Sequence, residues 1–267
     1  MESTAPGAHA APEPEDQSRF AEACMIVANV RSRLDRKDAQ LAVRLIARDD
    51  RAAHEEAERT LGDRGLDPLL DDPRLLRALI GTRYGVCASL PLFCYVVVRQ
   101  ALREVGEDDR ALADYVAAIV LHFGMRDRAM RVGEVDDERY DTLAALLGAV
   151  DTVDARRSFL VRAHLGNYAL WLSGLFPDRV EHLRWRRGGP DLEYYEAMGR
   201  RGFQLAADHR LAAEHGLRGL YAAVGERFGV VRCALNRVSD RLLFPHHHTP
   251  ERLMRQVRDD VRYRLAS

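Results

Sequence analysis

The chain is predicted to fold as an all-α protein, a compact bundle of about a dozen helices. Apolar residues recur at three- and four-residue spacing along most of the 267 residues, which is the period of an amphipathic helix. No stretch of more than a few residues alternates apolar with polar side chains, as a half-buried strand does. The bundle is expected to be either one domain or two closely packed helical subdomains.

The first half of the chain divides into a tail and a series of helices. Residues 1–17 are rich in Ala, Pro and Glu and lack apolar periodicity, so we expect a disordered tail there. Residues 18–267 are expected to form the helical domain, and any subdivision is expected near 125–136. Capping residues and apolar periodicity predict helices over 18–34, 37–48, 51–61, 73–80, 90–105 and 110–123.

Individual residues account for several of these limits. Asp72 followed by Pro73 is a cap with a first-turn proline, and the leucines and Ile80 that follow are expected to face inward. Ser89 and Pro91 mark the start of the next helix in the same way.

The second half continues the helical pattern. We expect helices from Asp136 or Asp137 through Leu147, over 158–176, through Val180 and Leu183, and from Asp191 to about His215. Residues 217–243 are expected to form one long helix, or two with a kink near Gly229. The last helix is expected from Pro250 through Leu253, Val257, Val261 and Leu265, which recur every four residues.

The stretch 158–176 is predicted to be a buried central helix. Asp154 caps its start and Pro177 ends it. Apolar residues lie nearly all round the helix, which indicates burial on several sides. Gly166 and Gly174 weaken a helix interior, and they are expected to let another backbone approach closely.

Two polar clusters on helices are candidate ligand pockets. His164, Asn167, Tyr168 and Trp171 share one face of the central helix. On a later helix, Arg232, Asn236, Ser239 and Asp240 form a stripe, to which Arg99, Asp114 and Tyr115 of neighbouring helices would add. Each cluster is either a pocket for a small polar ligand or an internal hydrogen-bonded network. We favour the network in both cases, since buried polar groups generally satisfy one another.

The one local basic cluster is Arg184, Trp185, Arg186 and Arg187, expected to be a loop ending in Gly-Gly-Pro. An arginine–aromatic loop can hold a phosphate or a nucleic-acid backbone. The formal net charge of −1 argues against a general nucleic-acid or membrane-surface binder, since such proteins carry a basic excess.

Composition excludes several chemistries. The positive charge is almost all arginine, with Lys37 the single lysine, and no phosphate-binding loop, nucleophile elbow or HExxH motif occurs. The four cysteines form no CxxC pair and no signal peptide precedes the domain, so a cytoplasmic protein is expected. The longest uncharged runs are too short to span a membrane.

These observations favour a cytoplasmic helical interaction or regulatory protein that acts by binding. A protein partner or a homo-oligomer is expected, without a cofactor or a metal. The alternatives are a helical-bundle enzyme or ligand-binding protein that uses the 158–176 face, and a phosphate or nucleic-acid binder that uses Arg184–Arg187. The missing catalytic signatures favour a binding protein over an enzyme.

Overall fold

The computed structural model describes residues 25–125, 128–132, 138–140, 142–152 and 154–264, and the expected tail lies outside them. In these ranges the chain is all-α, as predicted, and contains no strand. The α-helices are α2 (Arg36–Ala47), α3 (Arg51–Arg64), α4 (Asp67–Leu70), α5 (Pro73–Gly81), α6 (Leu90–Arg103), α7 (Arg110–Phe123), α8 (Leu143–Gly148), α9 (Ala155–Leu175), α10 (Pro177–Arg187), α11 (Leu192–Ala207), α12 (Arg210–Glu214), α13 (Arg218–Glu226), α14 (Phe228–Val238) and α15 (Pro250–Arg264). The short 3₁₀-helices are η1 (Arg31–Arg33), η2 (Arg83–Cys87) and η3 (Arg128–Met130), and η4 (Ser239–Leu243) is a π-helical turn that extends α14.

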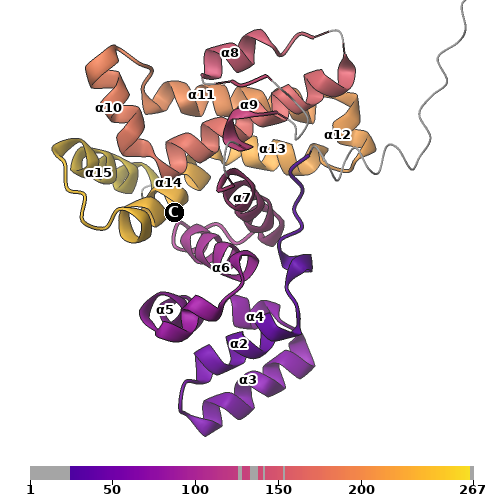
Figure 1. Cartoon of the computed structure of the whole chain (residues 1–267), viewed down its shortest axis with the longest axis vertical. Helices are drawn as coiled ribbons and strands as arrows, with labels where there is room; N and C mark the ends of the chain where they lie inside the picture. Colours follow the sequence, from indigo (N-terminus) through magenta and orange to yellow (C-terminus); the bar gives the residue numbers. More distant parts are fainter. Residues whose placement is uncertain (1–24, 126–127, 133–137, 141, 153, 265–267) are drawn as a thin grey trace, which may run out of the picture.

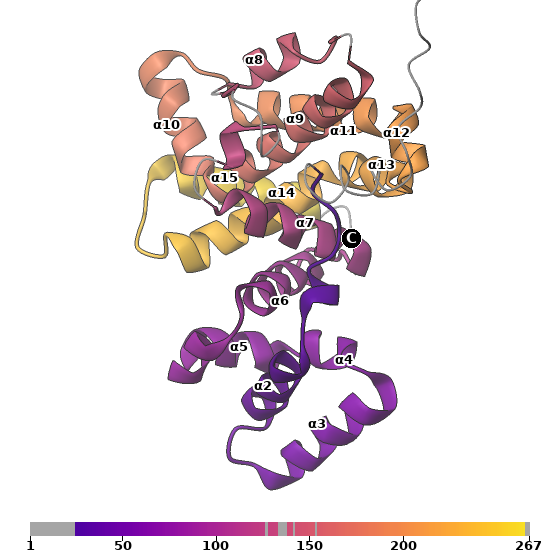
Figure 2. The same ribbon diagram turned by 45° about the vertical axis from the view of Figure 1, so that its right-hand side comes forward.

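The helices form an elongated molecule in which α6 and α7 lie in the middle (Figure 1). Helices α2 to α5 pack on one another at one end, and α8 to α15 surround α9 at the other (Figure 1). The segment before α2 runs alongside α6 and connects the two ends (Figure 2). Arg99 of α6 joins the middle of the molecule to the end formed by α2 to α5, since its guanidinium donates to Asp71, the residue after α4, at 2.7 Å.

Helix α9 is the buried centre that the sequence predicted. Asp154 caps it by accepting from the Arg156 amide, and most of its residues are buried on all sides. Its closest neighbour is α11, because a Cβ at Gly202 would lie 2.6 Å from the backbone nitrogen of Gly166. The two backbones can meet only while both positions lack side chains, which confirms the close approach expected at Gly166.

Several expected helix limits are wrong. Residues 25–34 contain only the turn η1 instead of a continuous helix. The helix expected from Asp136 begins at Leu143, because the hydroxyl of Thr142 caps it by accepting from the Ala145 amide. By contrast, the alternative of two helices with a kink near Gly229 is confirmed, since Arg227 separates α13 from α14.

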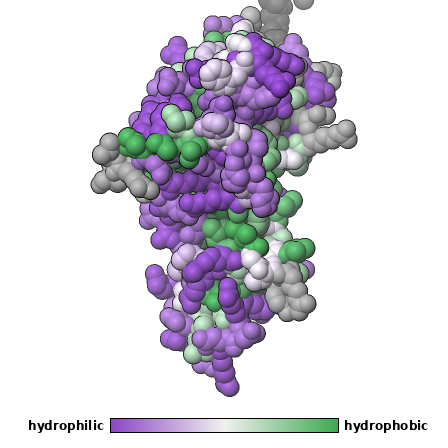
Figure 3. All heavy atoms as spheres, turned by 90° about the vertical axis from the view of Figure 1, so that its left-hand side faces the viewer, coloured by the Kyte–Doolittle hydropathy of each residue, from purple (hydrophilic) through white to green (hydrophobic). Residues whose placement is uncertain are grey.

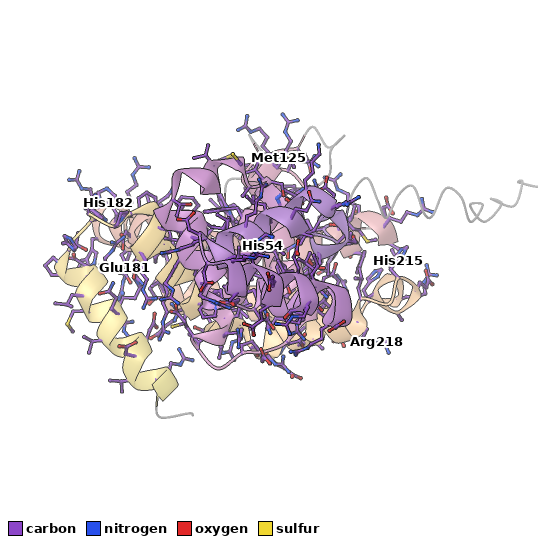
Figure 4. The ribbon with its side chains drawn as sticks, turned by 90° about the horizontal axis from the view of Figure 1, so that it is seen from below. His54, Met125, Glu181, His182, His215 and Arg218 are labelled. Atoms are coloured by element: carbon purple, nitrogen blue, oxygen red, sulfur yellow. The ribbon has the colours of Figure 1, made fainter. Side chains whose placement is uncertain are left out.

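Helix α15 begins at Pro250 as predicted, but its apolar side faces outward. Leu253, Met254, Val257 and Val261 are each between 53% and 65% exposed. The opposite side is buried and carries Arg252, Arg255 and Asp259. Seen from below, α15 lies at one end of the molecule beside α10, which carries Glu181 and His182, and its side chains project outward (Figure 4).

Candidate binding groove

The polar face of α9 lies in a packed interior. The hydroxyl of Tyr115 donates to Asn167 Oδ1 at 2.8 Å, and both side chains are buried. His164 Nε2 bonds the carbonyl oxygen of Ala129 at 3.0 Å. Burial lowers the pKa of His164 to about 4, so its imidazole is neutral at pH 7 and donates this hydrogen bond. Asn167 and His164 thus have partners within the fold, which supports the structural interpretation of this cluster.

The rings beside these groups continue the packing. Tyr168 is buried and stacks between His164 and Trp171, with centroid distances of 6.2 Å on each side. Trp171 is partly buried and contacts Phe123 and Phe176 edge-on. The four predicted residues therefore lie together, as helical spacing requires, within an aromatic layer.

The stripe on α14 caps the end of α9. Asn236 Nδ2 donates to the carbonyl oxygens of Ser173 at 2.8 Å and Gly174 at 2.7 Å. The hydroxyl of Ser239 donates to the Leu175 carbonyl at 2.7 Å. These are carbonyls that a helix end leaves without intrahelical partners. Arg232 in turn donates to Asn236 Oδ1 at 2.6 Å, which fixes the orientation of the amide.

Asn236 and Asp240 line one cavity of about 300 Å³, whereas the members of the proposed second pocket from other helices are dispersed. Asp240 pairs with Arg255 of α15 at 2.7 Å instead of bonding Asn236. Asp114 accepts from the Arg31 amide at 2.8 Å, and burial raises its pKa. Arg99 binds Asp71 and Asp108, and Tyr115 binds Asn167. The structure therefore does not bring Arg99, Asp114 and Tyr115 into one site with Asn236.

The residues Arg184 to Arg187 form the last turn of α10, so the loop expected there is wrong. Gly188 ends the helix in the left-handed conformation with φ 62°, which suits glycine. Trp185 is largely exposed, and the guanidinium carbon of Arg184 lies 5.7 Å from its ring centroid. Arg186 and Arg187 are exposed on the same turn.

A groove that sequence reasoning missed runs along α2. One cavity of about 610 Å³ is lined by Leu41, Arg44, Leu45, Arg48, Asp49, Ala78, Gly81, Thr82 and Cys87. A second cavity of about 360 Å³ shares Leu41, Arg44 and Cys87 with the first and reaches Asp35. Together they follow the whole of α2, whose 12 residues span about 18 Å. We call these two cavities the α2 groove.

Local sequence explains both walls of the α2 groove. Asp35 and Asp38 form a capping box that starts α2. On the other side, a Cβ at Gly85 would lie 1.9 Å from the carbonyl oxygen of Leu79, so only glycine lets η2 pack directly on α5. The hydroxyl of Ser89 then caps α6 by accepting from the Leu92 amide at 3.2 Å. These contacts place Cys87, which is exposed, on the wall opposite α2.

The rim of the groove carries charged side chains of both signs: Lys37, Arg44 and Arg48 lie among the carboxylates of Asp35, Asp38 and Asp49. Arg44 and Arg48 are exposed one turn apart, and neither forms an ion pair with any described residue. Arg99, Arg232 and Arg255, by contrast, are each paired with carboxylates. The carboxylates of Asp35 and Asp38 accept backbone amides, so Asp49 is the one lining carboxylate that no contact within the described residues engages.

The backbone at Arg48 is strained. This residue ends α2 with φ 52° and ψ −119°, and it is the one non-glycine residue with positive φ among those described. The conformation favours glycine and costs an arginine on the order of 1–3 kcal/mol.

Apolar surface adjoins the groove. Ile80, Val86 and Leu90 flank the lining residues Gly81, Cys87 and Ser89 in sequence and are exposed, Val86 by 88%. Ile80 was expected to face inward and does not, because the packing side of α5 is taken by Leu75, Ala78 and Leu79. A broad apolar area lies about midway along the face shown in Figure 3, at the level of α5 and the start of α6.

Two classes of site find no support in the described residues. No group of three or more His, Cys, Asp or Glu side chains is placed to hold a metal ion there. No helix in those ranges has both the length and the apolar character to cross a membrane.

Comparisons with models of protein families, with curated proteins and with solved structures give no match.

Proposed function

We propose that this protein is an interaction or regulatory protein, and that the α2 groove holds an amphipathic helix of a partner protein. The observation that carries the proposal is a groove with exposed apolar side chains beside it, whose rim presents two arginines, Arg44 and Arg48, without carboxylate partners in the described residues. A helix can lay its apolar side on Cys87 and on the exposed Ile80, Val86 and Leu90 beside the groove, with carboxylates against the two guanidiniums.

The shape of the groove favours a helix over a compact ligand. The groove is open and extends about 18 Å along α2, which matches a helix of three to four turns. Exposed Ile80, Val86 and Leu90 beside it would enlarge the apolar contact, and exposed patches of this kind mark interaction sites.

We also propose a reducing cytoplasmic location, which is supported by free Cys87, Cys94 and Cys233.

A binding titration tests this proposal. The probe is a fluorescein-labelled helical peptide of about 14 residues with leucines on one face and glutamates along its edge. Fluorescence anisotropy should show saturable binding to the full chain. The double substitution Arg44→Gln and Arg48→Gln should weaken binding at least about tenfold, because each removed guanidinium loses a charge-assisted contact.

The matched control is Arg186→Gln with Arg187→Gln, which removes the same charge from two exposed arginines of α10. This control should leave the dissociation constant unchanged. Equal weakening by both double variants would reduce the interaction to general charge attraction and overturn the proposal. Absence of saturable binding by the parent chain would overturn it as well.

A further inference from the structure

Helix α15 has its polar and apolar sides reversed relative to an ordinary surface helix. Arg252 pairs with Asp178, and Arg255 with Asp240, each at 2.7 Å. Asp259 binds Arg232 of α14 at 2.7 Å. The charged side is thus used to attach the helix, and the apolar side remains uncovered.

The apolar area that α15 leaves exposed is in the size range of protein interaction sites. Leu253, Met254, Val257 and Val261, which we call the α15 stripe, expose roughly 100 Å² each, or about 400 Å² together, in the range that marks interaction sites. Figure 3 shows a row of apolar atoms on the upper part of the visible face. Two such stripes in contact bury about 800 Å², so exposed neighbours such as Glu251 and Arg258 would have to supply the rest of the approximately 1,200 Å² of a small stable interface.

The apolar character of the α15 stripe indicates which kind of surface can pack on it. Arg252 and Arg255 of the polar side are buried in ion pairs, so these two are not available to hold anionic lipid headgroups, and the exposed Arg258 is one of the arginines of α15 that remain outside those pairs. The stripe itself contains no charge that would select a partner of opposite sign. An apolar stripe of four-residue period is complementary to another copy of itself.

We propose that the α15 stripe is a dimer interface between two copies of this chain, with the two α15 helices antiparallel about a two-fold axis at Val257. This arrangement places Leu253 against Val261 of the second copy and Val257 against its own counterpart. All of these contacts are apolar. A two-fold interface uses the same patch on both copies and closes the assembly at two.

The oligomeric state in solution tests this proposal independently of the α2 groove. Light scattering after size exclusion should give the mass of a dimer for the parent chain, at loading concentrations up to about 100 µM. Val257→Glu should give a monomer, because it places two carboxylates together at the axis. The control Ile80→Glu, a charge in the other apolar patch, should stay dimeric. A monomeric parent chain, or a Val257→Glu variant that remains dimeric, overturns the proposal.

Crosslinking tests whether the two-fold axis of the proposed dimer lies at Val257. In a chain with Cys24→Ser and Cys87→Ser, Val257→Cys should be joined into a dimer by a short bismaleimide, whereas Arg258→Cys, beside the stripe, should be joined far more slowly. Burial raises the pKa of the thiols of Cys94 and Cys233 to about 11, so these two stay unreactive near pH 7. Equal crosslinking of the two variants would contradict the two-fold axis at Val257. Binding to anionic vesicles that Val257→Glu abolishes would assign the stripe to a membrane instead.

Discussion

At the scale of single residues, substitution of Arg48 is expected to change the stability of the fold and the binding of the peptide in opposite directions. Its φ of 52° is a conformation that glycine adopts without strain, and its side chain stands at the rim of the α2 groove. A residue that is kept in a strained conformation for function should become more stable when the strain is relieved.

We therefore expect Arg48→Gly to raise the free energy of unfolding by up to about 1 kcal/mol while it weakens binding of the helical peptide. Arg48→Ala is the matched control, because alanine removes the guanidinium and keeps the strain. It should weaken binding equally and leave stability near that of the parent. Urea denaturation and peptide titration of both variants give the two numbers. An Arg48→Gly variant that is less stable than Arg48→Ala would show that the backbone is not strained.

The residue types predicted that the buried polar side chains are hydrogen-bonded within the fold, but not to which groups they are bonded. The favoured interpretation of Asn167 and Asn236 as members of internal networks agrees with their hydrogen bonds to Tyr115 and to the end of α9. The hydrogen-bond partner of each side-chain amide lies on a helix distant in sequence. A local sequence pattern therefore does not predict that partner. Whether either cluster also has a function stays a prediction.

At the scale of elements, α15 depends on charge for its attachment. Arg255 is 2% exposed and binds Asp240, with Asp178 nearby at 3.6 Å. Removing it leaves two partly buried carboxylates with less compensation, and breaking a buried pair in this way costs about 3–5 kcal/mol. Arg255→Ala should therefore lower the free energy of unfolding by an amount near that range, or release α15 from the rest of the fold.

Hydrogen exchange distinguishes these results, since a released α15 loses protection of its amides while α9 keeps its own. Arg258→Ala is the matched control, because Arg258 is an exposed arginine of the same helix. It should change stability by no more than about 0.5 kcal/mol. If the two variants behave alike, the buried ion pairs do not hold α15.

Most helices could be predicted because their caps lie in local sequence. Ser89 and Asp191 cap α6 and α11 as expected, and Asp109 caps α7. The errors have tertiary causes. The apolar pattern of α15 correctly indicates a helix, but periodicity does not reveal that the opposite side carries the ion pairs. The helical turn at Arg184–Arg187 continues to Gly188, because a left-handed glycine ends a helix later than the arginine cluster suggests.

At the scale of the whole molecule, the α2 groove could not be predicted. Its walls come from residues 35–49 and 78–89, and they face each other only because α2 packs on α5 and Gly85 lets η2 lie against the end of α5. The all-α class follows from periodicity alone, whereas the groove follows from how helices are placed. The domain subdivision expected near 125–136 stays a prediction.

The central claim is that a partner helix occupies the α2 groove, and the reactivity of Cys87 tests it most directly. Cys87 is exposed on the wall of the groove, and Cys24→Ser removes the one cysteine outside the described residues. Alkylation of Cys87 is followed by mass spectrometry, with and without the helical peptide. At a peptide concentration of about ten times its dissociation constant, alkylation should slow by about tenfold. An unchanged rate at saturating peptide would contradict the claim, because the peptide would then bind elsewhere.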